Sequence, residues 1–313
     1  MTILRKKVFI PLLIILGILA ASSGASYLVW QRAIYQKGLA QIYLLRTYIQ
    51  ERAKKNRCGN ISVMIKGLKS NFISPSIFSD NTSFEFNIDQ PFAAASMIKL
   101  PMAACCFKAQ REGRLDFTEK YQLKDTDRTE GSGVLKNMGS GKEFTIEDLL
   151  KLMIVESDNT AANIFIKRVG FDYFNGCFKE LGLNSTQLNR YILDFSSRRK
   201  GIENYITARD VSVLLEKAAS GKLVDQQASK EIMALLFRQR IKNRIPSLLP
   251  KDTPVANKTG TYNDVIHDAG VIYTPRGPLL LIILTQEVKD PIAAVNLIRR
   301  LSEFVYYIFV CGN

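Results

Sequence analysis

The pattern of hydrophobic and polar positions divides the 313-residue chain into a helical middle with strands before and after it. Ile61–Ile65 and Phe84–Ile88 alternate between apolar and polar residues, which is typical of half-buried strands. Three further strands are predicted near the C-terminus, over residues 254–259, 265–273 and 279–285. We therefore expect an α+β fold with two lobes, in which helices flank an antiparallel sheet and an all-α lobe is inserted.

Helical patterns fill the middle of the chain. A strongly apolar helix is predicted over residues 96–112, and Pro101 should kink it because proline donates no hydrogen bond to the carbonyl of Met97. Thr145–Asp148 resembles a capping box that opens the next helix. Residues 184–206 lack clear periodicity, so we expect a long functional loop there. The other predicted helices cover residues 161–169, 171–181, 207–215, 226–240 and 291–310.

The N-terminus carries a basic cluster, Arg5–Lys7, followed by an apolar run from Val8 to Trp30. This run is long enough for a transmembrane helix, although Ser23–Ala25 could also serve as a signal-peptidase site. Because apolar residues resume after that site, we expect an uncleaved single-pass anchor over about residues 8–30. The remainder of the chain is then extracytoplasmic, or secreted or periplasmic if the segment is cleaved.

The net charge of +14 is concentrated at the N-terminus. Residues 1–57 contain ten Lys or Arg and one acid, which gives +9 and leaves +5 for residues 58–313. Residues 31–57 predict an amphipathic juxtamembrane helix. Its positive charge indicates one of two roles: it sets the orientation of the anchor in the membrane, or it attracts the helix to an anionic lipid surface or wall polymer. No basic-aromatic motif indicates a nucleic-acid partner.

These observations predict a cytoplasmic tip, anchor and juxtamembrane helix over residues 1–57, and a folded domain over residues 58–313. Within that domain, we expect the α/β lobe to comprise about residues 58–92 and 207–313, and the all-α lobe about residues 93–206. We expect this domain to be monomeric.

The chain contains five cysteines, at Cys58, Cys105, Cys106, Cys177 and Cys311. They are too few and too scattered to predict a disulfide framework. Cys105 and Cys106 lie on the apolar helix, where we expect them to pack as small hydrophobic side chains. Cys58 and Cys311 could join the two ends of the folded domain. With a single histidine, His267, and no close cysteine spacing, we expect no zinc site.

Ser96 and Lys99 are the first candidates for chemistry. Positions three residues apart on a helix share one face, so the Lys99 amine can reach the Ser96 hydroxyl. A serine hydroxyl becomes a nucleophile when a base takes its proton, and a desolvated lysine can be that base. Ser-x-x-Lys alone is expected by chance about once in a chain of this length, so its meaning depends on its partners.

Two further motifs follow in order, Ser157-Asp158-Asn159 after 61 residues and Lys258-Thr259-Gly260 after another 101. Together with Ser96-x-x-Lys99, they form the triplet of the serine β-lactamases and penicillin-binding proteins. The intervals resemble those of class A β-lactamases, and the resemblance covers about residues 58–310. It implies a serine acyl-enzyme hydrolase that needs no cofactor.

The resemblance also implies a role for each motif residue. Ser96 is the nucleophile, Lys99 its base, and Ser157 relays a proton to the leaving nitrogen. Backbone N–H groups of Ser96 and Thr261 form the oxyanion hole. Arg244 matches a position where some class A enzymes bind the substrate carboxylate, or it is a solvated charge. The residues expected to bind substrate are Asn159, Lys258, Thr259, Gly260 and Thr261.

One position departs from the class A pattern. Thr186–Tyr191 matches the start of the loop that carries the glutamate directing the hydrolytic water, but the glutamate position falls on Ile192. An isoleucine cannot orient or deprotonate water. Asp194 lies two residues further on, and we expect its shorter side chain to point elsewhere. Glu203 is expected to pair with Arg190 across the loop.

The sequence therefore predicts efficient acylation of Ser96 by a β-lactam or a D-Ala-D-Ala-like amide, followed by slow deacylation. Two alternatives remain open: a cell-wall DD-peptidase acting on peptidoglycan stem peptides, and a β-lactam-binding sensor that acylates without turnover. His267 follows the third motif and is expected to be structural.

Overall fold

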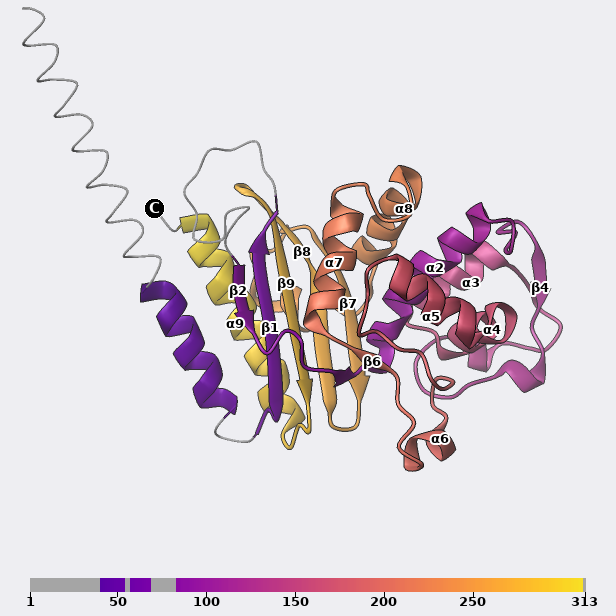
Figure 1. Cartoon of the computed structure of the whole chain (residues 1–313), viewed down its shortest axis with the longest axis horizontal. Helices are drawn as coiled ribbons and strands as arrows, with labels where there is room; N and C mark the ends of the chain where they lie inside the picture. The colour runs from indigo at the N-terminus through magenta and orange to yellow at the C-terminus, as the bar shows by residue number, and fades with distance from the viewer. Residues whose placement is uncertain (1–39, 54–56, 69–82, 312–313) are drawn as a thin grey trace, which may run out of the picture.

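A five-stranded antiparallel sheet forms the centre of the computed structural model, which describes residues 40–53, 57–68 and 83–311 (Figure 1). Its strands lie in the order β2-β1-β9-β8-β7, so strands from the beginning and the end of the chain are neighbours. Their bounds are β1 Asn60–Gly67, β2 Ser83–Phe86, β7 Val255–Tyr262, β8 Val265–Thr274 and β9 Gly277–Gln286. The predicted single sheet is confirmed, although β2 ends two residues before the predicted bound.

Helices cover both faces of this sheet. In β9, Leu279, Leu281 and Ile283 face one side, where α9 (Pro291–Cys311) and the helix at residues 40–53 pack. The alternate residues Leu280, Ile282 and Leu284 face α2 (Lys99–Arg111), α7 (Ala208–Ala219) and α8 (Gln226–Phe237). Strand side chains alternate between the two faces, so a continuous apolar strand indicates burial on both sides.

The chain leaves the sheet and returns to it through a short pair of strands. β3 (Phe92–Ala93) and β6 (Tyr205–Ile206) pair antiparallel, and the all-α lobe lies between them in the sequence. Helices α3 (Ile146–Val155), α4 (Asn159–Val169) and α5 (Phe171–Glu180) form that lobe together with α2. The two-lobe α+β architecture is therefore confirmed.

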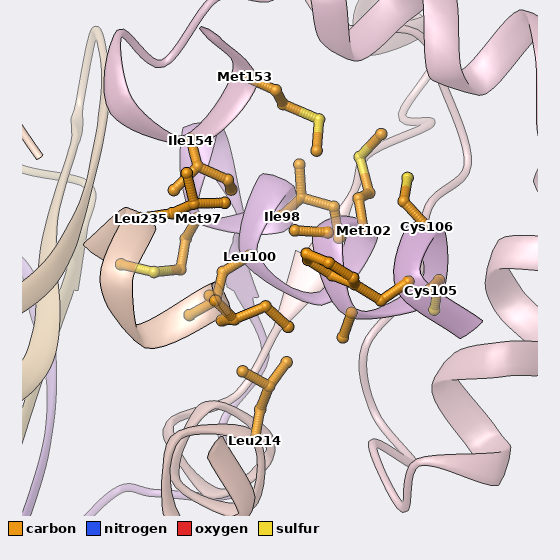
Figure 2. Close-up of a cluster of buried hydrophobic side chains, with 14 of the residues drawn as sticks. Met97, Ile98, Leu100, Met102, Cys105, Cys106, Met153, Ile154, Leu214 and Leu235 are labelled. Carbon is orange, nitrogen blue, oxygen red and sulfur yellow. The ribbon is translucent and has the colours of Figure 1, made fainter. Parts of the chain in front are cut away.

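Helix α2 is buried except near its C-terminal end. Figure 2 shows Met97, Leu100 and Met102 packed among side chains of neighbouring helices, including Met153 of α3 and Leu214 of α7. Ten of the thirteen residues of α2 are buried. Helices that are apolar on all sides occupy the interior of a protein, and α2 accordingly forms the axis on which the two lobes meet.

The kink expected at Pro101 is wrong as stated. Residues Ala95–Ile98 form a 3-10 turn, η1, and α2 begins only at Lys99. Pro101 is therefore the third residue of the α-helix, where a backbone N–H has no partner within the helix. Proline is tolerated in the first turn of an α-helix for this reason. Instead of a kink at Pro101, the chain changes from a 3-10 turn to an α-helix at Lys99.

Most other helix predictions are confirmed. Thr145 accepts the N–H of Asp148 while the Asp148 carboxylate accepts the N–H of Thr145, which forms the predicted capping box. The long loop at residues 184–206 contains one short helix, α6 (Phe195–Arg199), and ends in β6. Helix α8 ends three residues before the predicted bound. Two short strands, β4 (Lys120–Gln122) and β5 (Glu143–Thr145), pair beside α3.

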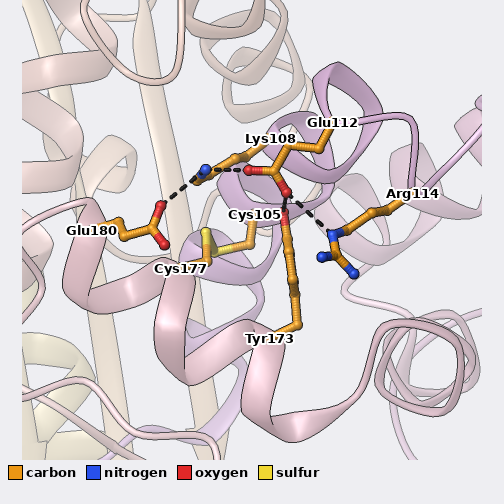
Figure 3. The surroundings of a disulfide bond; sticks show 7 residues. All are labelled: Cys105, Lys108, Glu112, Arg114, Tyr173, Cys177 and Glu180. Carbon is orange, nitrogen blue, oxygen red and sulfur yellow. Dashed lines mark hydrogen bonds and ion pairs between the residues drawn. A yellow bond between two sulfur atoms is a disulfide. The ribbon is translucent and has the colours of Figure 1, made fainter.

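The cysteine predictions need correction. Cys105 of α2 and Cys177 of α5 form a disulfide across 72 residues, with a Cα–Cα distance of 5.9 Å (Figure 3). Cys105 is therefore not a small hydrophobic side chain, although Cys106 is buried and free as expected. Cys58 and Cys311 are both free thiols, so the predicted link between them is wrong. The bond closes a loop that contains most of the all-α lobe.

The predicted anchor, over residues 8–30, lies outside the described residues. Within the described ranges, no helix has both the length and the apolar character needed to cross a bilayer. The helix predicted within residues 31–57 is present over residues 40–53, and its Leu45 and Ile49 are fully buried in the same apolar cluster as residues of α9.

Candidate active site

Ser96 lies in the turn η1, between the sheet and the all-α lobe, and is partly exposed. The preceding residue, Ala95, has a positive φ of 44°, a conformation that costs a side-chain-bearing residue energy. The turn is held by the Met97 N–H, which donates to Ala94 O at 3.0 Å, and the Ala94 N–H, which donates to Asn204 O at 2.8 Å. The strained residue precedes the candidate nucleophile directly, as is common at functional sites.

Lys99 is fully buried directly below Ser96. Its Nζ lies 3.2 Å from Ser96 Oγ, 2.5 Å from Ser157 O and 2.6 Å from Asn159 Oδ1. Burial, and then the nearby charge of Lys258, hold the pKa of Lys99 well below its ordinary value. A buried lysine without a carboxylate partner can lose its proton and become a base.

Lys258 is the second fully buried lysine and comes from β7. Its Nζ donates to Ser157 Oγ at 3.0 Å and to Thr259 O at 3.0 Å. Burial lowers the pKa of Lys258 to about 7. Ser157 therefore connects the two lysines, because its Oγ is also 3.4 Å from Lys99 Nζ.

Ser157 occupies a tight turn between α3 and α4 and has a φ of 54°. Asp158 fixes this turn: its Oδ2 accepts the N–H groups of Val134 and Leu135, and its Oδ1 accepts that of Ala161. The predicted helix stop at this motif is confirmed. The turn points the hydroxyl and the carbonyl of Ser157, together with the side-chain amide of Asn159, toward Lys99.

Close packing explains one glycine beside this turn. Gly133 has a φ of 111°, and a Cβ added there would lie 2.2 Å from Asp158 Oδ2. A larger residue at position 133 would push the Asp158 carboxylate away from the N–H groups that it holds.

The third motif lines the opposite edge of the site on β7. Thr259 is buried, Gly260 faces the ring of His267, and Thr261 is exposed at the end of the motif. Arg244 lies beneath them, where its guanidinium donates to Gly260 O at 2.9 Å and to His267 O at 2.5 Å and contacts Thr261 Oγ1. Arg244 is therefore not a solvated charge, and it reaches the rim through Thr261.

Sequence reasoning missed Asp268, which is the acid under this group of cations. It is fully buried, and its carboxylate accepts the N–H of Ile245 at 2.9 Å and the Asn257 amide at 3.0 Å. Burial raises its pKa to about 6. The signal was an aspartate on an otherwise apolar strand, since an unpaired buried acid is costly.

His267 is structural, as expected. It is fully buried, its Nε2 lies 2.9 Å from Ala93 O, and its Nδ1 accepts the N–H of Thr285 at 3.1 Å. Burial lowers its pKa to about 4. The ring connects β3 to the sheet and does not reach the pocket.

A pocket of about 200 Å³ opens above Ser96. One side, here called the motif wall, consists of residues from the three motifs and includes Ser96, Asn159 and Thr261. The other side, here called the loop wall, consists of Arg190, Ile192, Leu193 and Asn204. The remaining lining residues are Ala95, Gly131, Ser132 and Tyr262. None of these lining residues carries a carboxylate.

Backbone contacts hold the loop wall in place. The side chain of Asn163 accepts the N–H of Ile192 at 2.8 Å and donates to its carbonyl at 3.1 Å. Leu193 has a φ of 61°, which fits the sharp turn at this point. Asp194 faces away from the pocket: it caps α6 by accepting the N–H of Ser197 at 3.0 Å. The prediction that Asp194 points elsewhere agrees with this geometry.

Two arginines, Arg190 and Arg198, anchor the loop through ion pairs. Arg190 pairs with Glu203 at 2.5 Å, as predicted. Arg198 lies 3.1 Å from Glu203 and 3.4 Å from Asp264, and its guanidinium covers the Tyr262 ring at 4.1 Å. Together these contacts fasten the loop to the turn that follows the third motif.

The chain resembles known proteins over most of its length. Residues 44–309 match the model of the β-lactamase enzyme family. β-Lactamase VEB-1 from Pseudomonas aeruginosa is 27% identical over 249 residues, which cover 71% of this chain and 81% of that protein.

Solved structures show the same fold. A β-lactamase from Sphaerobacter thermophilus is 26% identical with a TM-score of 0.71, covering 86% of this chain and 95% of that one. A leucine-to-glutamate variant of PBP-A, in an acyl-enzyme complex with penicillin G, is 27% identical with a TM-score of 0.74, covering 85% of this chain and 96% of that one. The chain therefore belongs to the β-lactamase enzyme family and is a serine hydrolase of the β-lactamase and penicillin-binding protein superfamily.

Proposed function

We propose that Ser96 attacks the carbonyl carbon of a β-lactam or a D-Ala-D-Ala-like amide, with Lys99 as the base. The observation that carries this proposal is the buried Lys99 amine, 3.2 Å from Ser96 Oγ, with a pKa held far below its ordinary value. A general base placed in this way contributes about 10²- to 10⁴-fold to a rate.

The contacts of Lys99 Nζ suit a neutral amine. Such a group has two N–H donors and one lone pair, and two carbonyl acceptors, Ser157 O and Asn159 Oδ1, lie at 2.5 and 2.6 Å. The lone pair is then free to accept the hydroxyl proton of Ser96. This arrangement leaves the base ready before substrate arrives.

The proton then travels to the leaving group. As Ser96 Oγ bonds to the carbonyl carbon and the C–N bond breaks, the Ser157 hydroxyl donates its proton to the nitrogen. Ser157 recovers a proton from Lys99 along their 3.4 Å contact, and Lys258 donates to the Ser157 oxygen throughout at 3.0 Å. The N–H groups of Ser96 and Thr261 stabilise the oxyanion.

The motif wall also suits a substrate with a carboxylate. Arg244 supplies positive charge below Thr259, Gly260 and Thr261, Lys258 adds to it when its amine is protonated, and the threonine hydroxyls supply donors. Arg244 acts through Thr261, which it contacts directly, and orients that hydroxyl. The Asn159 side chain accepts from Lys99 and donates to Glu130 O at 2.8 Å, so only the second N–H of its amide is left for the substrate.

We propose that deacylation is slow, because no carboxylate lies on the loop wall at Ile192 and Asp194 is committed to capping α6. This favours two alternatives over an efficient β-lactamase. One is a cell-wall DD-peptidase that releases its peptide acyl group differently, and the other is a sensor that stays acylated. The likeness to PBP-A, solved as a penicillin G acyl-enzyme, supports acylation.

Residues 58–313 are proposed to form the catalytic domain, with lobes at about 58–92 and 207–313 and at about 93–206, on the extracytoplasmic side of an N-terminal anchor. The strand pair β3 and β6, at residues 92–93 and 205–206, supports the division between the lobes. The Cys105–Cys177 disulfide supports an oxidising compartment, because such bonds rarely persist in the cytosol.

A chromogenic β-lactam, followed by both product absorbance and intact mass, tests the proposal. We expect one covalent adduct per chain that persists long after mixing, and no adduct on Ser96→Ala. Rapid turnover without a lasting adduct would refute slow deacylation. Release of D-Ala from a wall peptide would favour the peptidase over the sensor.

A further inference from the structure

A second, larger cavity lies on the far side of the sheet from Ser96. It has a volume of about 790 Å³ and lies between the helix at residues 40–53 and α9. Leu44, Tyr48, Phe304 and Tyr307 supply most of its apolar lining. Figure 1 shows these two helices side by side on the face of the sheet opposite α7.

The outer surfaces of the two helices are unusually apolar for exposed positions. Of the eight large hydrophobic side chains that are exposed among the described residues, five belong to these helices. They are Tyr43, Leu44, Ile292, Phe304 and Tyr307, with exposures between 41% and 74%. An exposed group of this kind marks an interaction surface, and an aromatic-rich one is typical of a membrane interface.

The helix at residues 40–53 is nevertheless firmly fixed to the domain. Leu45 and Ile49 are fully buried beneath α9, so the helix cannot turn its outer side chains inward. The exposed surface is therefore a permanent feature of the folded chain.

Charge and position in the chain indicate the partner. The cavity lining holds two arginines and two glutamates: Arg300 pairs with Glu303 at 3.0 Å, whereas the Arg52 guanidinium covers the Tyr48 ring at 5.1 Å and Glu51 lies beside it in the sequence. The basic excess therefore comes from the segment around the helix rather than from the cavity itself. Seven Lys or Arg and a single acid occur between residues 32 and 57. The apolar run at residues 8–30 ends only nine residues before the described helix, a span of at most about 30 Å.

From these observations we propose that the surface formed by residues 40–53 and α9 rests on an anionic phospholipid bilayer. Tyr43, Leu44, Phe304 and Tyr307 enter the interface between headgroups and acyl chains, while Arg52 contacts lipid phosphates. The sheet then separates the bilayer from Ser96, so the pocket of the catalytic site opens away from the lipid.

Tryptophan quenching in the full-length chain tests this orientation. The native Trp30 is replaced by Trp30→Phe, and one new tryptophan is introduced as Tyr307→Trp or as Phe237→Trp. Phe237 is a matched control, because it is 38% exposed against 48% for Tyr307 and lies on α8, across the sheet. Each chain is placed in nanodiscs of phosphatidylcholine with phosphatidylglycerol, with or without brominated acyl chains.

We expect brominated lipid to reduce the emission of Tyr307→Trp at least about twofold and to leave Phe237→Trp unchanged, since quenching needs contact with the acyl region. Adding Arg52→Gln should weaken the quenching. Equal quenching at both sites, no quenching at Tyr307→Trp, or failure of the chain to associate with the discs would overturn the proposal. A dimer in which Tyr307→Trp is shielded but unquenched would assign the surface to a second copy instead. None of these readouts depends on acylation of Ser96.

Discussion

The motif wall and the loop wall face each other across one pocket, yet they are built from different kinds of side chain. On the motif wall, Lys99, Ser157 and Lys258 form a buried network with hydrogen-bond distances between 2.5 and 3.4 Å. On the loop wall, Ile192 and Leu193 present alkyl groups, while the loop's carboxylates are engaged elsewhere: Asp194 caps a helix and Glu203 pairs with Arg190. Forming an acyl-enzyme and releasing it are separate chemical tasks, and only the first has its charged groups in place.

The largest expected effect comes from removing the base of the motif wall. Lys99→Met should slow acylation by a β-lactam by about 10³-fold, because the amine that takes the Ser96 proton is lost. Acylation is measured by intact mass against time. Lys200→Met is the control, since Lys200 is exposed and distant in the loop. A rate within about threefold of wild type would show that another group is the base.

Converting the loop wall should produce the next largest effect. Ile192→Glu places a carboxylate in the pocket wall that faces Ser96, and should speed deacylation by about 10²-fold. Loss of the adduct after removal of excess β-lactam measures this rate. Ile192→Gln has nearly the same shape without the charge and should remain slow. If both variants behave alike, water access rather than a missing base limits deacylation.

A smaller effect concerns the free energy of unfolding and tests whether a charged Lys258 destabilises the folded motif wall. Folding lowers the pKa of Lys258 from 10.5 to about 7, so between these values the unfolded chain binds a proton that the folded chain does not. The free energy of unfolding should therefore rise from pH 7 to pH 9.5 through this site. Urea unfolding of Lys258→Met should lack that part of the increase. Parallel curves for variant and wild type would argue against a neutral Lys258.

The smallest expected effect comes from removing the Arg198 contacts beside the loop wall. Arg198→Ala removes the contacts with Glu203, Asp264 and Tyr262, and should cost less than about 1 kcal/mol of stability because these ion pairs are partly exposed. Amide exchange over residues 189–206 should nevertheless become faster. Arg199→Ala, one residue further on and exposed, should leave exchange unchanged. Equal exchange in the two variants would mean that Arg190 and Asn163 alone hold the loop.

The reactive residues of the site could be predicted from the sequence better than the buried residues that surround them. Ser96, Lys99, Ser157 and Lys258 were found because their chemistry requires fixed residue types in a fixed order. Asp268 was missed because its function depends on burial beside Asn257 and Arg244, which no local pattern records. A local sequence pattern identifies the reactive residues. The residue that balances their charge, Asp268, is recognised only from three-dimensional packing.

The fold shows the same division. Alternation and capping predicted most strands and helices, since these signals are local. The pairing of Cys105 with Cys177 could not be predicted, because connectivity depends on how α2 and α5 pack. The turn η1 was read as helix because its apolar pattern continues into α2.

The order of strands in the sheet has a consequence for folding during synthesis. β1 pairs with β9, so Asn60 meets Gln286 only after almost the whole chain has emerged. Until then, β1 and β2 can form only an isolated hairpin, which is marginally stable in water, and Lys99 has no Lys258 beside it. The nascent chain must therefore remain open until its last strands arrive, and the catalytic network forms in the final stage of folding.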